Sequence, residues 1–351
     1  MKACRSFISV LLFGLLASTI ASCGLAQDSP QPATAPPTLP TANPSLPSRN
    51  TIPPAEEPAL STTTSPAAEQ PVTGKIFFDD FSYDSALAMI ANGWILRDKA
   101  GWPGIPGASW SSENVSFVDD PDQAGNRLLQ MVSATNGVAS GTHQTQVCHQ
   151  RKYLEGTYAA RVRFSDQPLS GPDGDQLVET FYMISPLQAS LDPDFSEMDN
   201  EYLPNGGWGN TQPTFFVTTW ETAQIEPWIA DNLSETHQGS LAGWHTLLIQ
   251  VGKGDVNYLL DGNPIAHHWG KTYPESPMSI NFNLWFIDGG LLKSDEIREW
   301  VERVDWVYFE ADTMLSPAQV EGRLQELRAA SSPFLDTVPA WDPPLDSPCD
   351  L

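Results

Sequence analysis

Three carboxylates stand at alternate positions in the segment 196–203, which reads Ser-Glu-Met-Asp-Asn-Glu-Tyr-Leu. In a β-strand, alternate side chains lie on one face, so Glu197, Asp199 and Glu201 are expected to point the same way. Neighbours in such a row lie roughly 6.6 Å apart. At an effective dielectric constant of about 20, each charged pair costs roughly 2.5 kcal/mol. At least one carboxyl group should therefore stay protonated above the pH at which a free side chain ionises.

A protonated carboxyl group beside an ionised carboxylate is the pair that glycosidic bond cleavage requires. Two other interpretations fit the same pattern. A fully exposed acidic strand would let water screen the charges, and the row would then have no chemical meaning. A calcium site is the other, although calcium usually takes loop oxygens at varied spacing. The pattern taken alone leaves all three interpretations open.

A second segment, 278–286, alternates apolar residues with Asn281, Asn283 and Trp285. Amide groups suit sugar hydroxyls, and an indole ring suits the apolar face of a sugar. We therefore expect this polar face in a substrate cleft, the alternative being an ordinary solvent-facing side of a strand.

Three further aromatic residues are candidates for sugar contacts. Trp208 lies in a Gly-rich loop directly after the carboxylates, where it is either a platform at the cleft rim or a loop anchor packed on the domain. Trp220 and Tyr182 lie in neighbouring strand-like runs. The chain has 12 Trp residues, and many of them are expected to be core.

The elements that must position these residues are strands. From about residue 74 to 312, short β-forming runs are broken by Gly, Pro, Asn and Asp, and no repeated βαβ pattern occurs. This predicts one antiparallel β-sandwich domain. The segment 313–351 holds one helix, 318–330, with Val320, Leu324 and Leu327 at helical spacing, followed by a Pro-rich tail.

The N-terminus indicates export. A short basic start precedes the apolar run 7–20, which is too short for a comfortable membrane span. Ile-Ala-Ser-Cys at 20–23 resembles a bacterial lipobox, so residues 1–22 are expected to be a lipoprotein signal peptide and Cys23 the lipidated residue. The alternative is an ordinary signal peptide with an incidental Cys. The Pro/Thr/Ser-rich segment 23–73 is expected to be a disordered linker.

Charge and cysteine content narrow the partners. The formal net charge is −25, which excludes nucleic acid as a natural partner, disfavours sulfated glycans and leaves neutral glycans open. Of the four cysteines, Cys4 would leave with the signal peptide and Cys23 would be lipidated. Cys148 and Cys349 remain, either as a disulfide, which export permits, or as two free thiols. No spacing of Cys and His indicates zinc.

Beyond these residue-level arguments, the run Glu-Met-Asp-Asn-Glu at 197–201 resembles the Glu-x-Asp-x-Glu signature of family 16 glycoside hydrolases. Other segments resemble that family in the right order across residues 76–310. They are Phe-Asp-Asp-Phe at 78–81, the strand 156–164, Trp-His at 244–245 with Tyr-Leu-Leu-Asp-Gly at 258–262, Asn-Leu-Trp at 283–285 and Val-Asp-Trp-Val at 304–307.

The resemblance implies a concanavalin A-like β-jelly-roll sandwich, with two antiparallel sheets and a concave sugar cleft. It also implies a retaining mechanism in which Glu197 is the nucleophile, Glu201 the acid/base and Asp199 a hydrogen-bond partner of the nucleophile. No cofactor is implied, although some members carry a structural calcium ion whose ligands the sequence does not indicate. We expect a monomer that contacts the membrane only through its lipid anchor, at the cell surface or in the periplasm.

The implied activity is endo-hydrolysis of a neutral β-1,3- or β-1,3-1,4-glucan. A transglycosylase and a non-catalytic carbohydrate-binding or adhesion lipoprotein are the alternatives. Four departures from the family pattern bear on the substrate, and two of them concern Asn200 and Tyr182. Asn200 stands where an apolar residue is usual, so it needs hydrogen-bond partners if it points inward. Tyr182 stands where many members have Trp.

Overall fold

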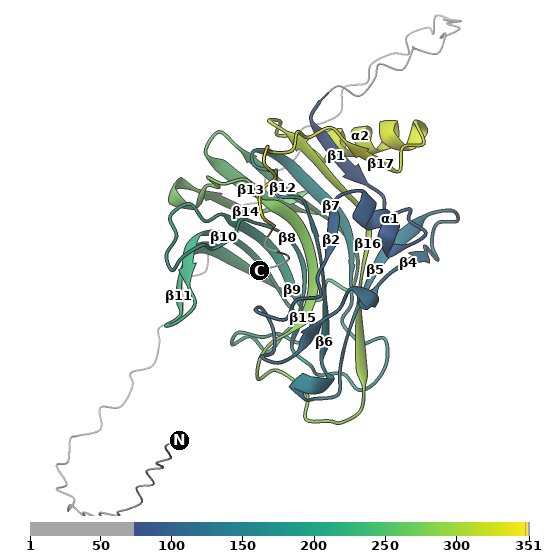
Figure 1. Ribbon diagram of the computed structural model, residues 1–351, viewed down its shortest axis with the longest axis vertical. Coiled ribbons are helices and arrows are strands. Elements are labelled where there is room, and N and C mark those ends of the chain that lie inside the picture. Colours follow the sequence, from purple (N-terminus) through teal and green to yellow (C-terminus); the bar gives the residue numbers. More distant parts are fainter. Residues whose placement is uncertain (1–73, 348, 350–351) are drawn as a thin grey trace, which may run out of the picture. The chain divides into compact units, whose positions relative to one another are not determined.

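The computed structural model describes residues 74–347 and 349 (Figure 1). The predicted signal peptide, the lipidation site Cys23 and the linker lie outside the described residues. Within the described part of the chain, no helix is long and apolar enough to cross a membrane.

Two antiparallel sheets make up the described domain. The first, which we call the site sheet, has the order β2-β6-β15-β8-β9-β10-β11. Its strands bend together as one curved layer in Figure 1. Their bounds are β2 Trp94–Leu96, β6 His143–His149, β15 Ser279–Phe286, β8 Leu177–Ile184, β9 Glu197–Leu203, β10 Thr214–Gln224 and β11 Ile229–Gln238.

The second, the back sheet, has the order β4-β5-β16-β7-β12-β13-β14. β1 pairs with β16 and β17, and the short β3 adds a parallel pair to β6. The bounds are β1 Ile76–Asp79, β3 Ser109–Trp110, β4 Val115–Asp119, β5 Arg127–Thr135, β7 Gly156–Phe164, β12 Gly243–Gly252, β13 Asp255–Leu260, β14 Asn263–Trp269, β16 Arg298–Ala311 and β17 Phe334–Asp336.

The main core lies between the two sheets, where alternate residues of facing strands meet. Met198 and Tyr202 of β9 and Ile280 and Phe282 of β15 are fully buried in it. The residues between them therefore point to the outward face of the site sheet, because side chains alternate along a strand. The apolar face expected for 278–286 is the core face.

The helix α2, Pro317–Ala329, covers the other side of the back sheet, and α1, Ala86–Ala91, lies near β2. α2 begins at a capping box formed by Ser316 and Gln319. Its residues Val320, Leu324 and Leu327 are buried, as their spacing predicts. The described domain is thus the predicted all-β jelly-roll sandwich with a short C-terminal helix.

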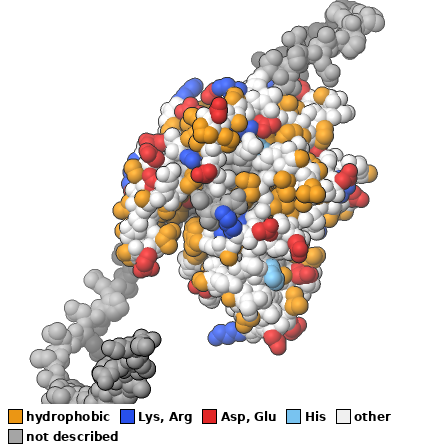
Figure 2. Space-filling view, viewed as in Figure 1, with side chains coloured by type: hydrophobic (Ala, Val, Ile, Leu, Met, Phe, Trp, Pro, Cys, Tyr) orange, Lys and Arg blue, Asp and Glu red, His pale blue; other side chains and the backbone are white. Residues whose placement is uncertain are grey.

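Acidic side chains are scattered over the visible face and do not gather in one patch (Figure 2). The negative charge is therefore spread over this face.

Candidate active site

The carboxylate row lies on β9, in the middle of the site sheet, between β8 and β10. Because Met198 and Tyr202 face the core, Glu197, Asp199 and Glu201 point to the outward face. Both glutamates are partly exposed, whereas Asp199 is 4% exposed. Asn200 points inward, and its amide donates to the carbonyl oxygen of Phe181 at 3.3 Å, which meets the requirement stated from the sequence.

Burial raises the pKa of all three carboxyl groups, and their mutual repulsion adds to the effect. A hydrogen bond between Asp199 and Glu197 lowers the pKa of Glu197 and raises that of Asp199. Asp199 is therefore the donor, and Glu197 is the carboxyl of this pair that ionises first. The pKa of Glu201 is held well above its usual value by desolvation and by Asp199. Burial nevertheless raises the pKa of Glu197 to about 8, so all three carboxyl groups of the row hold protons more tightly than free side chains do, and Glu197 ionises more readily than Asp199.

Trp220 stands directly across from Glu197 on β10. Its indole Nε1 donates to Asp199 Oδ2 at 2.7 Å and lowers the pKa of Asp199. Trp228, which is 56% exposed, packs edge-on against Trp220 with ring centroids 6.1 Å apart. Trp220 therefore orients Asp199, and the two indoles border the carboxylates on the β10 side.

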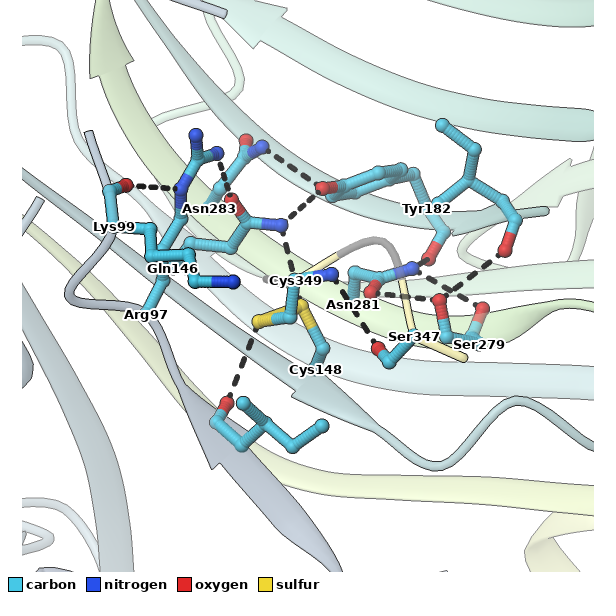
Figure 3. The surroundings of a disulfide bond; sticks show 12 residues. Arg97, Lys99, Gln146, Cys148, Tyr182, Ser279, Asn281, Asn283, Ser347 and Cys349 are labelled. Atoms are coloured by element: carbon cyan, nitrogen blue, oxygen red, sulfur yellow. Dashed lines mark hydrogen bonds between the residues drawn. A yellow bond between two sulfur atoms is a disulfide. The ribbon is translucent and has the colours of Figure 1, made fainter. Parts of the chain in front are cut away.

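Tyr182 stands across from Asp199 on β8. Its hydroxyl accepts hydrogen bonds from Gln146 Nε2 at 2.8 Å and Asn283 Nδ2 at 3.2 Å (Figure 3). Asn283 Oδ1 in turn accepts from the Thr180 hydroxyl at 2.6 Å. Tyr182 and Asn283 are on the predicted face, but they are only 8% and 3% exposed. Their polar atoms are largely engaged with each other.

Asn281 differs from its predicted role. It is on the outward face, paired with Tyr182 in the sheet, yet it is fully buried. Its Nδ2 donates to the carbonyl oxygens of Tyr182 and Ser279, and its Oδ1 accepts from the Ser279 hydroxyl. In this structure Asn281 ties strands together and has no surface for a sugar, because Cys349 packs beside it (Figure 3).

Aromatic side chains gather beside Glu201. Trp285 packs with Trp110 and Leu203 and is 9% exposed. Trp208 is 48% exposed, with its ring centroid 6.1 Å from that of Trp285 and 5.2 Å from that of Phe216. Trp208 therefore anchors its loop and also presents a ring face next to the carboxylate row, so the two roles expected for it from the sequence, loop anchor and rim platform, are compatible.

Sequence reasoning missed two residues on this face, Gln146 and Arg97. Gln146 points outward from β6 between the core residues Thr145 and Val147, and this alternation was available as a signal. Arg97 Nη1 donates to Gln146 Oε1 at 2.7 Å, and its guanidinium lies 4.1 Å from the ring centroid of Trp110. Local sequence gives no signal that Arg97 reaches this face, because Gln146, its side-chain partner there, lies 49 residues away in the chain.

The two cysteines left open by the sequence, Cys148 and Cys349, form a disulfide. Among the described residues, no group of three or more His, Cys, Asp or Glu side chains is arranged to hold a metal ion.

Comparisons with known proteins bear on the fold. No protein-family model and no curated protein sequence matches this chain. Among solved structures, the chain is similar to a β-glucanase of Bacillus licheniformis, with 15% identity over 68% of this chain and 99% of the other and a TM-score of 0.49. A second similar structure is a prokaryotic β-1,3-1,4-glucanase (lichenase) derived from a mouse hindgut metagenome, with 18% identity over 67% of this chain and 99% of the other and a TM-score of 0.48. A third is a glycoside hydrolase family 16 endo-glucanase from Bacteroides ovatus, with 15% identity over 66% of this chain and 98% of the other and a TM-score of 0.48. With identities below 20% and TM-scores below 0.5, these similarities assign neither a family to the chain nor a role to any residue.

Proposed function

We propose that this chain is a retaining β-glycanase that hydrolyses a neutral polysaccharide, with a β-1,3- or β-1,3-1,4-glucan as the first candidate. The observation that carries the proposal is the row of three outward carboxylates on β9, of which both glutamates are partly exposed. The two flanking aromatic groups, at Trp220 and at Trp208, suit the apolar faces of sugar rings.

In the first step, the ionised Glu197 attacks the anomeric carbon while Glu201 donates its proton to the departing glycosidic oxygen. This breaks the glycosidic bond and leaves the sugar esterified to Glu197. In the second step, Glu201 removes a proton from water, and the resulting hydroxide displaces Glu197 from the anomeric carbon. Asp199 holds Glu197 in place through its hydrogen bond, and Trp220 holds Asp199.

The remaining properties are part of the same proposal. Residues 1–22 direct export, Cys23 carries the lipid anchor, and the acidic domain acts as a monomer at the cell surface or in the periplasm. The chemistry needs no cofactor, because both steps use carboxyl groups alone.

The test is a panel of purified glucans, digested by the wild-type domain, by Glu197→Gln and by Glu201→Gln. We expect the wild type to release reducing sugar from at least one glucan, and Glu197→Gln to lose about 10³-fold or more of that activity. Equal activity in all three proteins would refute the assignment of the carboxylates. Binding of a glucan without cleavage by any of them would favour the non-catalytic carbohydrate-binding protein.

A further inference from the structure

The chain after β17 returns to the site sheet. We call residues 337–347 together with Cys349 the C-terminal strap. The first residues of the strap are held by Lys152. Its Nζ donates to both carboxylate oxygens of Asp336, just before the strap, and to the carbonyl oxygen of Val338 within it. Further on, Leu345 forms an isolated antiparallel bridge with Arg151. The strap ends in the disulfide between Cys349 and Cys148.

The position of Cys148 places this disulfide on the same face as the carboxylates. Cys148 pairs with Asn281, Asn281 pairs with Tyr182, and Tyr182 pairs with Asp199, so the four side chains form one row across β6, β15, β8 and β9. Three strand spacings of about 4.8 Å put the disulfide roughly 14 Å from Asp199. Figure 3 shows Cys349 beside Gln146 and Asn281.

Because the disulfide lies on the β6 side, the two halves of the outward face of the site sheet differ in exposure. On the β6 side, Cys148 and Cys349 are fully buried, and Asn281 beside them has no exposed surface. On the β10 side, Trp220 is partly exposed and Trp228 is 56% exposed. A polysaccharide that crosses the strands over Glu197 and Glu201 thus meets an open surface in one direction and the strap in the other.

The strap itself is lightly attached between its two ends. Trp341 is 53% exposed, and the residues 342–344 and Asp346 are exposed as well. A cavity of about 270 Å³ lies between the strap and the chain at β2 and β6, lined in part by Ile95 and Arg151. The disulfide is therefore the main constraint that keeps Cys349 on the site sheet.

We propose that the strap is a specificity-determining segment, which closes the β6 side of the substrate-binding face so that only a short chain end fits between the carboxylates and the disulfide. This inference rests on the proposed function. It replaces the endo cleavage implied by the family resemblance with cleavage close to a chain end. The disulfide form releases short oligosaccharides from chain ends, and the form without the disulfide accepts long chains on both sides of Glu197 and Glu201.

The test measures binding, so it needs no turnover. Glu197→Gln in the full chain is compared with Glu197→Gln/Cys349→Ser, using gluco-oligosaccharides of graded length prepared from β-1,3-glucan and from mixed-linked β-glucan. With the disulfide, affinity should stop rising beyond a short length. Without it, affinity should continue to rise and become at least tenfold tighter for the longest chains. Labelling of Cys148 by a thiol reagent reports that the strap has left, and adding Leu345→Glu removes its second contact if labelling is incomplete.

Glu197→Gln/Trp341→Ala is the matched control, since it changes an exposed strap residue and keeps the disulfide. Its affinity should depend on oligosaccharide length in the same way as that of Glu197→Gln. Mild reduction of Glu197→Gln gives the same comparison without a second substitution. The same length dependence in all proteins, with Cys148 labelled, would overturn this inference alone. No binding of any oligosaccharide by any of the folded proteins would overturn the proposed function and this inference with it.

Discussion

Asp199 determines which carboxyl group of the row on β9 carries the charge. Its hydrogen bond to Glu197 lowers the pKa of Glu197, and its own charge, when present, raises the pKa of Glu201. The two effects belong to different protonation states, since the protonated Asp199 donates to Glu197 and the ionised Asp199 repels charge on Glu201. The indole Nε1 of Trp220 lies 2.7 Å from Asp199 Oδ2, at the short end of the range for an N–H···O hydrogen bond, and fixes the orientation of Asp199.

Asp199→Ala tests the effect of this hydrogen bond. The substitution removes the donor that lowers the pKa of Glu197, so the acidic limb of the pH–activity profile, which reports ionisation of the nucleophile, should move to higher pH. We also expect kcat to fall by about 10²-fold, because Glu197 loses the partner that holds it in position. The measurement is kcat/KM against pH for both proteins. An acidic limb that stays in place would show that Asp199 does not act on Glu197.

At the level of single residues, the sequence predicted which side chains share a face, because period-two alternation follows from strand geometry. It predicted the outward direction of Glu197, Asn283 and Trp285 for this reason. It did not predict the burial of Asn281. The alternation of residues along a strand predicts which way a side chain points. It carries no information about a segment distant in the sequence, such as the one ending in Cys349, that covers the side chain.

At the level of elements, the strap and β17 depend on one buried ion pair. The Lys152 side chain is 3% exposed, and Asp336 on β17 is its carboxylate partner. The sequence predicted a Pro-rich tail and left Cys148 and Cys349 as a disulfide or two thiols, since spacing alone does not decide between them. The return of the tail to the site sheet is set by contacts between residues far apart in the chain, such as Lys152 with Asp336.

Asp336→Ala should destabilise the domain strongly. The change leaves the Lys152 ammonium group buried without a counter-charge and with the Val338 carbonyl as its remaining hydrogen-bond partner, which costs about 3 kcal/mol of the free energy of unfolding. Lys75→Ala is the control, because Lys75 and Asp312 form an exposed pair whose loss should cost less than about 1 kcal/mol. Urea denaturation monitored by Trp fluorescence measures both. Equal effects of the two substitutions would contradict this reading of the Lys152 pair.

At the scale of the whole molecule, the interior holds carboxyl groups that favour their neutral forms. Burial raises the pKa of Glu179 on β8 and of Glu302 on β16 well above the usual value. Repulsion from Asp166 adds to the shift of Glu179, and repulsion from Glu179 adds to that of Glu302. Burial also raises the pKa of Asp79 to about 7. In the unfolded chain these groups ionise at ordinary values near 4.

The folded domain should therefore lose stability as the pH rises. Above about pH 4 the unfolded chain has released protons that the folded domain still binds, so the free energy of unfolding falls with pH, by up to about 1.4 kcal/mol per pH unit for each group. For Asp79 this fall ends near its folded pKa of about 7. Denaturant midpoints at pH 5 and pH 8 measure the effect. The side chain in Glu302→Gln cannot ionise, so the denaturant midpoint of this variant should fall less between pH 5 and pH 8 than that of the wild type. An equal fall in both proteins would contradict the raised pKa of Glu302.

The most direct test of the account is to trap the covalent intermediate. A 2-fluoro-glucoside with a good leaving group forms the ester with a retaining glycosidase and slows its hydrolysis, because the fluorine destabilises the positively charged transition state. After reaction with the wild-type domain and proteolysis, mass spectrometry identifies the modified peptide. We predict a single adduct on Glu197 and none in Glu197→Gln. An adduct on Glu201 or elsewhere, or no adduct with a domain that does cleave the glucan, would contradict it.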